Sequence, residues 1–445
     1  MFSLRRLIQL SALSGAAVFM PTVMVEAQDV EYEVPPILSA KDLLGKADLK
    51  GPYHKVADEV TNDGYFNNYV LESKFGKETI EGQQLLDIRI GELIALVELD
   101  KMSSSKVVGD SAYEGGKAIV QAPVKAVGKV VDTVSDPQKV KDTVTGIPDG
   151  AERLFSWAYR QAKSGVQAVG DVISPSGTPE PDSGYSAGGA LNAGKDLGLK
   201  YIGYSKRERE LFQILKCNPY TTNKLVQSEV SRVVSLQTTV GVAFRFVPGL
   251  GLLSQLDTFN TWYDRAQQLS LYEEPEEIFK KNKAELMKLG VTEENTLAFL
   301  RSKVYNPWTQ RFISNSLTQI GPKVSGHNEF IKMANTADNE PTTLYFVSVA
   351  EAMEKLHKRR PLRKIVTSLY IPAAVTRDGL LYVPLSVDYL FWTQEVAGIF
   401  EDFKKRVLAE EKFSSAEVRI RGKASPLARR KLEALGAKVV TGGLS

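Results

Sequence analysis

The spacing of apolar residues changes within the first hundred positions. Tyr69 and Leu71 belong to an alternating run, and the preceding Asn62-Asp63-Gly64 is typical of a turn because these residue types tolerate a positive φ. Three short strands, forming a β-meander, are therefore predicted between residues 53 and 81. Residues 83 to 99 change to helical spacing, so we expect a helix that covers the apolar face of the meander. Its apolar stripe consists of Leu86, Ile90, Leu93, Ile94 and Val97.

A second amphipathic pattern covers residues 113 to 173. Valines recur there at helical spacing, lysines occupy another side, and Pro123, Pro137 and Pro148 divide the segments. The valines make a thin apolar face, which favours packing against another helix over binding to a bilayer surface. Residues 174 to 195 are rich in Pro, Gly, Ser and Ala and contain too little apolar surface to fold, so they predict a flexible linker.

Capping residues indicate helix starts between residues 196 and 340. Asn306-Pro307 and Asn218-Pro219 each place an Asn cap before a proline, which is a favoured first helical residue. The glutamates around Pro275 indicate a further helix start, since acidic residues favour a first turn. The apolar run from 240 to 253 is broken by proline and glycines, and we interpret it as a buried helix end and turn.

The last hundred residues mix both kinds of element. Two strand-like runs, 365–375 and 380–385, flank Thr376-Arg377-Asp378-Gly379 and predict a hairpin. A long helix is expected from Val387 to Glu410. Residues 417 to 440 predict a strand, a helix that begins at a Ser-Pro pair, and a final strand.

These patterns together predict an α+β fold, mainly helical and divided into several domains. The expected parts are a signal peptide (1–27), an N-terminal α+β unit of meander and helix (28–100), amphipathic helices (101–173), the linker (174–195), a central helical domain (196–340), and a C-terminal mixed α/β domain of hairpin and strand–helix–strand unit (341–445).

The first 27 residues indicate in which compartment the protein is found. Two arginines precede an apolar stretch from Leu7 to Val25, and small residues stand three and one positions before Gln28. This order is typical of a bacterial signal peptide that is cleaved after Ala27. A retained membrane anchor is the alternative, because the apolar stretch is just long enough to span a bilayer. We therefore expect export through the Sec pathway to the periplasm or the cell exterior.

The strand–helix–strand residues at the end of the chain resemble the opening of a BRCT repeat. The likeness rests on Gly422, Ala428-Arg429, Leu432-Glu433 and Leu435-Gly436-Ala437. We interpret it as convergence on a common pattern, because an exported protein has no use for a module of DNA repair.

Composition and charge exclude several partners and chemistries. The 445 residues carry a net charge of +3, so no overall field attracts nucleic acid. The single cysteine, Cys217, cannot form an intramolecular disulfide, and its place at a predicted helix end favours a buried, unreactive thiol. None of the three histidines has a metal-binding spacing, and no motif for a catalytic nucleophile or a phosphate loop is complete. We therefore predict no catalytic residue, metal or cofactor.

One basic cluster is the candidate binding site. It surrounds Pro361, and its charge suits phosphorylated envelope lipid, although a solvated helix end has the same pattern. The candidate anion-binding residues are Lys358, Arg359, Arg360, Arg363 and Lys364.

The sequence favours an exported cell-envelope or secreted protein that acts by binding or as a structural component, without catalysis. Its expected partners are another envelope protein or anionic lipid head groups. Two alternatives stay open. One is a periplasmic hydrolase whose carboxylates are dispersed along the chain. The other is a protein that binds anionic lipid surfaces through residues 113–134 and the basic cluster.

Overall fold

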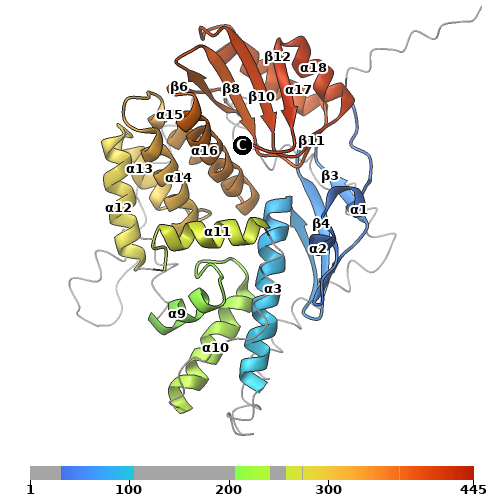
Figure 1. Ribbon diagram of the computed structural model, residues 1–445, viewed down its shortest axis with the longest axis vertical. Coiled ribbons are helices and arrows are strands. Elements are labelled where there is room, and N and C mark those ends of the chain that lie inside the picture. Colours follow the sequence, from blue (N-terminus) through green and yellow to red (C-terminus); the bar gives the residue numbers. More distant parts are fainter. Residues whose placement is uncertain (1–31, 105–205, 241–256, 273, 370, 445) are drawn as a thin grey trace, which may run out of the picture. The chain divides into compact units, whose positions relative to one another are not determined.

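The computed structural model describes residues 32–104, 206–240, 257–272, 274–369 and 371–444 (Figure 1). The predicted signal peptide, the amphipathic segment 113–173, the linker and the apolar run after Val240 lie outside the described residues. Apolar side chains of the described residues gather in two clusters. We call them the N-terminal core, which contains α3 (Gln83–Ser104), and the C-terminal core, which contains α14 (Pro307–Ile320).

The meander forms, but with four strands where three were predicted. Its strands are antiparallel with β4 in the centre, and they are β2 (His54–Val56), β3 (Glu59–Asn62), β4 (Asn67–Ser73) and β5 (Gly76–Glu81). The number differs because the first strand is interrupted, and β2 and β3 pair with successive parts of β4. The short strand β1 (Leu38–Ser39) pairs with β3 and is followed by α1 (Ala40–Leu43) and α2 (Lys46–Leu49). Gly64 has a φ of 113°, and its N–H donates to Asn62 Oδ1 at 2.7 Å, so the turn forms as its residue types predict.

Helix α3 follows β5 and packs on the meander, as its apolar spacing predicts. Leu86, Ile90 and Ile94 of the predicted stripe are all buried. The N-terminal core also contains side chains from α9 (Lys206–Ile214) and α10 (Lys224–Val240), and α10 lies beside α3 (Figure 1). Helices from beyond residue 205 therefore complete a core that begins in the first hundred residues.

The helical part of the C-terminal core runs from residue 257 to 359. In addition to α14 it consists of α11 (Asp257–Gln268), α12 (Pro275–Lys288), α13 (Glu293–Leu300), α15 (His327–Ala334) and α16 (Glu340–Arg359). The predicted starts at Pro275 and Asn306 are confirmed, and Asn306 forms a capping box. The prediction at Asn218-Pro219 is wrong, because these residues form a turn and α10 begins only at Lys224, where Asn223 caps it.

A mixed sheet with strand order β12-β10-β8-β7-β6 completes the C-terminal core. Its elements are β6 (Leu362–Thr367), β7 (Pro372–Thr376), β8 (Leu380–Leu385), β10 (Ser415–Ile420), α18 (Pro426–Ala434) and β12 (Ala437–Thr441). The predicted hairpin is confirmed as β7 and β8, although the first predicted strand is divided into β6 and β7. The strand–helix–strand prediction is also confirmed, because β10 and β12 pair in parallel on either side of α18 in the sequence.

The prediction of a long helix from Val387 to Glu410 is wrong at the start of the helix. The N–H groups of Asp388 and Tyr389 donate to the backbone oxygen of Tyr65 at 2.9 and 3.2 Å, which holds this segment extended. Strand β9 (Tyr389–Leu390) then pairs with β11 (Lys423–Ala424). The helix begins only after Thr393, as α17 (Gln394–Phe403) and a π-helical segment (Lys404–Leu408).

Helices and strands share both cores, so the predicted α+β class is confirmed. Within the residues that the structure describes, none of the helices combines the length and the apolar character needed to cross a membrane.

Candidate functional site

A small pocket lies where the two cores meet. Its walls come from α3, the α9–α10 connection, α11, α14 and α16, and its volume is about 30 Å³. Among the lining residues, Leu344 belongs to the N-terminal core, Trp308 to the C-terminal core, and Trp262 packs against both. Ligand sites often occur at such junctions between packed units.

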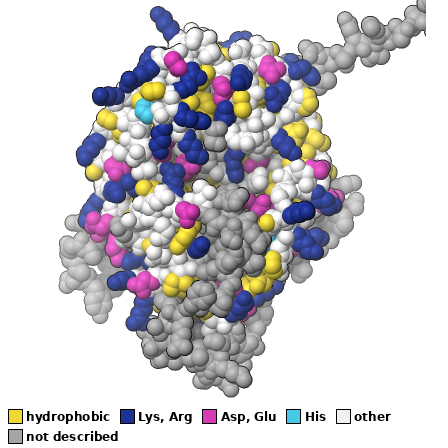
Figure 2. All heavy atoms as spheres, in the orientation of Figure 1, with side chains coloured by type: hydrophobic (Ala, Val, Ile, Leu, Met, Phe, Trp, Pro, Cys, Tyr) yellow, Lys and Arg dark blue, Asp and Glu magenta, His cyan; other side chains and the backbone are white. Residues whose placement is uncertain are grey.

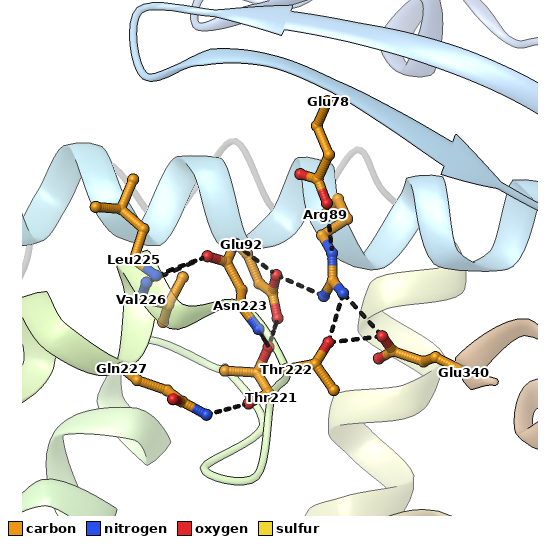
Figure 3. Close-up of polar contacts among 10 residues, drawn as sticks. All are labelled: Glu78, Arg89, Glu92, Thr221, Thr222, Asn223, Leu225, Val226, Gln227 and Glu340. Carbon is orange, nitrogen blue, oxygen red and sulfur yellow. Dashed lines mark hydrogen bonds and ion pairs between the residues drawn. The ribbon is translucent and has the colours of Figure 1, made fainter. Parts of the chain in front are cut away.

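Arg89 of α3 organises the acidic side of this junction (Figure 3). Its Nη1 lies 3.0 Å from Glu92 Oε2, its Nη2 lies 2.8 Å from Glu340 Oε2, and its Nε lies 3.4 Å from Glu78 Oε1. Thr222 Oγ1 accepts a hydrogen bond from Arg89 at 2.7 Å and donates one to Glu340 at 2.6 Å. These contacts join β5, α3, the loop before α10 and the first turn of α16.

One guanidinium group therefore faces three carboxylates. Burial alone would lower the pKa of Arg89, but Glu92, Glu340 and Glu78 together raise it above its ordinary value. The side chains of Arg89 and Glu92 are 7% and 1% exposed, so this pair is withdrawn from water. Removing one member of such a pair leaves the other buried and uncompensated.

Glu92 and Glu340 differ in how their oxygens are used. Glu92 Oε1 accepts from the Thr221 hydroxyl, and Glu92 Oε2 accepts from Asn223 Nδ2 at 3.0 Å as well as from Arg89. Both oxygens of Glu92 are thus occupied. Glu340 uses only Oε2, and its Oε1 forms no hydrogen bond or ion pair with the part of the chain that the structure describes. Glu340 lines the pocket and is 21% exposed, so it is the accessible carboxylate of the site.

Aromatic side chains form another part of the lining. Trp262 and Tyr263 come from α11 and Trp308 comes from α14. Trp262 meets Phe312 edge to face at 5.0 Å, and Trp308 Nε1 donates to the backbone oxygen of Leu271 at 3.0 Å. Both indoles are therefore fixed by their surroundings, and the pocket has a preformed aromatic wall.

Lys216 contributes a cation to the same lining. Its backbone has a φ of 56° at the end of α9, and the hydrogen bond from Cys217 N to Phe212 O completes a Schellman motif around it. Glycine is the usual residue at that position, because a side chain there strains the backbone. The Lys216 ammonium group lies 4.9 Å from the centroid of the Tyr263 ring, within range of a cation–π interaction.

The predicted basic cluster lies at the end of α16 and on β6, away from this lining. Three of its charges are paired, because Lys358 contacts Glu354 at 2.7 Å, Arg360 contacts Asp378 at 2.6 Å and Lys364 contacts Glu411. Arg363 donates to the backbone oxygen of Lys412. Arg359 forms no hydrogen bond or ion pair with the described residues, although its charge opposes the rise in the pKa of Tyr382 that burial causes. Basic and acidic side chains are also interspersed over the face that Figure 2 shows. The anion-binding role of this cluster stays a prediction.

Each of the three histidines contacts the backbone. Nε2 of His54 lies 3.1 Å from the oxygens of Ala47 and Asp48, and Nε2 of His327 lies 2.9 Å from the oxygen of Gly321. His357 Nδ1 accepts from the N–H of Leu362. Among the described residues, no group of three or more His, Cys, Asp or Glu side chains is arranged to hold a metal ion.

Cys217 is buried, as predicted for an unreactive thiol. It is 1% exposed, and burial raises the pKa of its thiol well above the ordinary value, with a further contribution from Glu92. A thiol in this state is a poor nucleophile because the thiolate is scarce.

The sequence contains only faint signals for the pocket. Two of its residues, Asn306 and Asn218, belong to the Asn-Pro pairs that predict helix starts. The remaining lining residues come from segments spread between Ile88 and Leu344, and no local spacing connects Glu92 with Glu340. Only the tertiary structure brings them together.

The chain has no significant match to a protein-family model, to a curated protein or to a solved structure.

Proposed function

We propose that the chain is an exported cell-envelope or secreted protein that binds a small ligand, without catalysis, in the pocket between its two cores. The supporting observation is the pocket itself, in which a fixed aromatic wall faces an accessible carboxylate, Glu340. A preformed apolar wall with a few convergent polar groups is the usual composition of a ligand site.

A carboxylate-dependent hydrolase is the second candidate, because Glu92 and Glu340 line one cavity. General acid–base catalysis requires a carboxyl group that can release and accept a proton near the operating pH. Glu92 accepts hydrogen bonds on both oxygens from Arg89, Thr221 and Asn223, so neither oxygen is free to take a proton from a substrate. The pocket therefore supports binding better than hydrolysis.

Binding to anionic lipid is the third candidate. It depends on residues 113–134, which lie outside the described residues, and on the basic cluster, whose members Lys358, Arg360 and Lys364 are paired with carboxylates. Paired charges attract an anionic surface less than free ones do. An envelope protein or lipid head group as partner, and the division into separate domains at the predicted boundaries, remain proposals.

Export is tested by the mature N-terminus. We expect the protein purified from its native host to begin at Gln28 and to be recovered outside the cytoplasm. N-terminal sequencing of fractionated cells provides the measurement. Intact protein that still begins at Met1 in the cytosolic fraction would contradict this part of the proposal.

The binding function is tested by tryptophan fluorescence, because Trp262 and Trp308 line the pocket. A collection of neutral, cationic and anionic small molecules is titrated into the full chain. We expect at least one compound to change the emission, and Trp262→Phe to remove most of that change. Trp392→Phe is the matched control, since Trp392 is buried against Phe400 and does not line the pocket. If none of the compounds changes the tryptophan emission in a saturable way, the binding function is contradicted.

A further inference from the structure

We infer that the ligand of this pocket carries a primary ammonium group, and that the Lys216 ammonium group occupies part of its site when the ligand is absent. This inference rests on the proposed binding function and specifies the chemical class of the ligand.

The charges around the pocket favour a cation. One guanidinium, that of Arg89, is in contact with three carboxylates, those of Glu78, Glu92 and Glu340. Glu340 Oε1 forms no hydrogen bond or ion pair within the described residues, so one carboxylate oxygen remains at the lining as an acceptor. A ligand ammonium group can donate to this oxygen in a charge-assisted hydrogen bond.

The aromatic lining favours the same class of ligand. Cations bind over the faces of Trp and Tyr rings within about 6 Å of the centroid. Lys216 already places its ammonium group 4.9 Å from the centroid of Tyr263, so one ring of the lining holds an ammonium group within the chain. An anion would be repelled by the faces of these rings.

The free oxygen of Glu340 restricts the head group. A primary ammonium group has N–H donors for Glu340 Oε1, whereas a trimethylammonium group has none.

Lys216 is expected to compete with the ligand. It occupies the left-handed position of a Schellman motif, where glycine would avoid backbone strain, and its side chain lines the pocket. Replacing Lys216 by glycine therefore removes the competing cation at a position that suits glycine. A site that is no longer partly occupied binds its ligand more tightly.

Isothermal titration calorimetry of the full chain with ethanolamine tests the inference. The comparisons, at equal ionic strength, are choline, whose nitrogen carries no N–H donor, and the anion acetate. We expect ethanolamine to bind and the other two to give no saturable heat. Lys216→Gly should tighten ethanolamine binding by about tenfold and Glu340→Gln should weaken it by about tenfold, as expected when a cation–π competitor or a charge-assisted partner is removed. Lys332→Met and Glu329→Gln on α15 are the matched charge controls and should change nothing.

The outcomes separate this inference from the binding function. If a neutral or anionic compound binds at the tryptophans while ethanolamine does not, the ammonium class is wrong and the binding function stands. Ethanolamine binding that Lys216→Gly leaves unchanged or weakens would overturn the role of Lys216. Because Lys216→Gly changes a residue that strains its own backbone, it remains informative even if Glu340→Gln fails to fold.

Discussion

Arg89 is the residue on which the junction between the cores most depends. It contacts glutamates from β5, from its own helix and from α16, and it donates to Thr222 in the loop before α10. Its guanidinium is buried together with Glu92, so this pair has lost water in exchange for the contact. Arg89 therefore joins four segments through a single side chain.

We expect Arg89→Met to lower the free energy of unfolding by about 3 kcal/mol, because it leaves Glu92 buried without its cation. Chemical denaturation followed by circular dichroism measures the loss. Lys74→Met is the control, since the ion pair of Lys74 with Asp100 is about half exposed and should contribute less than about 1 kcal/mol. Equal losses for the two variants would show that Arg89 has no special role.

Gly422 illustrates a second constraint at the scale of one residue. A Cβ at this position would lie 1.8 Å from the backbone oxygen of Asp388, where strand β9 approaches β11. At Gly398, within α17, a Cβ would meet nothing within 4 Å. Packing therefore requires glycine at position 422 but leaves room for a side chain at position 398.

We expect Gly422→Ala to destabilise the protein by about 2 kcal/mol or more, because the backbone must move to relieve the overlap. Gly398→Ala should instead stabilise it by about 0.5–1 kcal/mol, since alanine is the better helix former. Thermal unfolding of both variants compares the signs. A Gly422→Ala protein as stable as the wild type would contradict the close packing of β9 and β11.

At the scale of elements, Asp388 links the C-terminal part of the chain to the meander. Its Oδ2 accepts from the backbone N–H of Asn67 at 3.1 Å and from that of Gln83, the first residue of α3, at 3.0 Å. Burial raises the pKa of Asp388 above its ordinary value, although Arg421 and the two N–H donors oppose the shift. The charged form is therefore disfavoured in the folded protein.

Folding takes up protons when a carboxyl group has a higher pKa in the folded than in the unfolded chain. The contribution of Asp388 to stability is therefore complete below its unfolded pKa of 3.8, and it is lost as the pH rises through its folded pKa. Asp388→Asn keeps an acceptor oxygen and removes the charge. We expect it to be at least as stable as the wild type at pH 7, with the difference shrinking as the pH falls toward 4.

Asp378→Asn is the matched comparison with the opposite sign. Hydrogen bonds from Thr376 and Arg360 lower the pKa of Asp378, so its contribution is present at neutral pH and is lost as the pH falls through the folded pKa. Asp378→Asn should be less stable than the wild type at pH 7 and approach it in acid. Denaturation curves of both variants from pH 4 to 8 provide the measurement. The same pH trend in both differences would refute the assignment for Asp388.

At the scale of the whole molecule, local patterns predict most of the elements and little of their assembly. The meander, the Asn306 cap and the strand–helix–strand unit each depend on residues close together in sequence. The start of the helix after Val387 could not be predicted, because the chain there bonds to Tyr65. Spacing alone could not show that hydrogen bond.

The pocket was beyond prediction for a related reason. Its lining depends on tertiary contacts such as the one between Arg89 and Glu340, whose side chains carry no motif in common. The sequence instead singles out a dense run of basic residues, which is conspicuous because its members are neighbours. In the fold, Lys358, Arg360 and Lys364 of that run are each paired with an acidic side chain.

The most direct test of the central claim is a titration of the ¹⁵N-labelled full chain with ethanolamine, followed at the indole N–H signals of its tryptophans by NMR. Trp262 and Trp308 line the pocket, whereas Trp392 packs on Phe400 and serves as an internal reference. A ligand site at the junction of the two cores predicts saturable shifts of the Trp262 and Trp308 signals, with Trp392 unchanged. Equal shifts of the Trp262, Trp308 and Trp392 signals would contradict it. No shift with ethanolamine would exclude the ammonium class, and no shift with any compound of the fluorescence collection would contradict the ligand site itself.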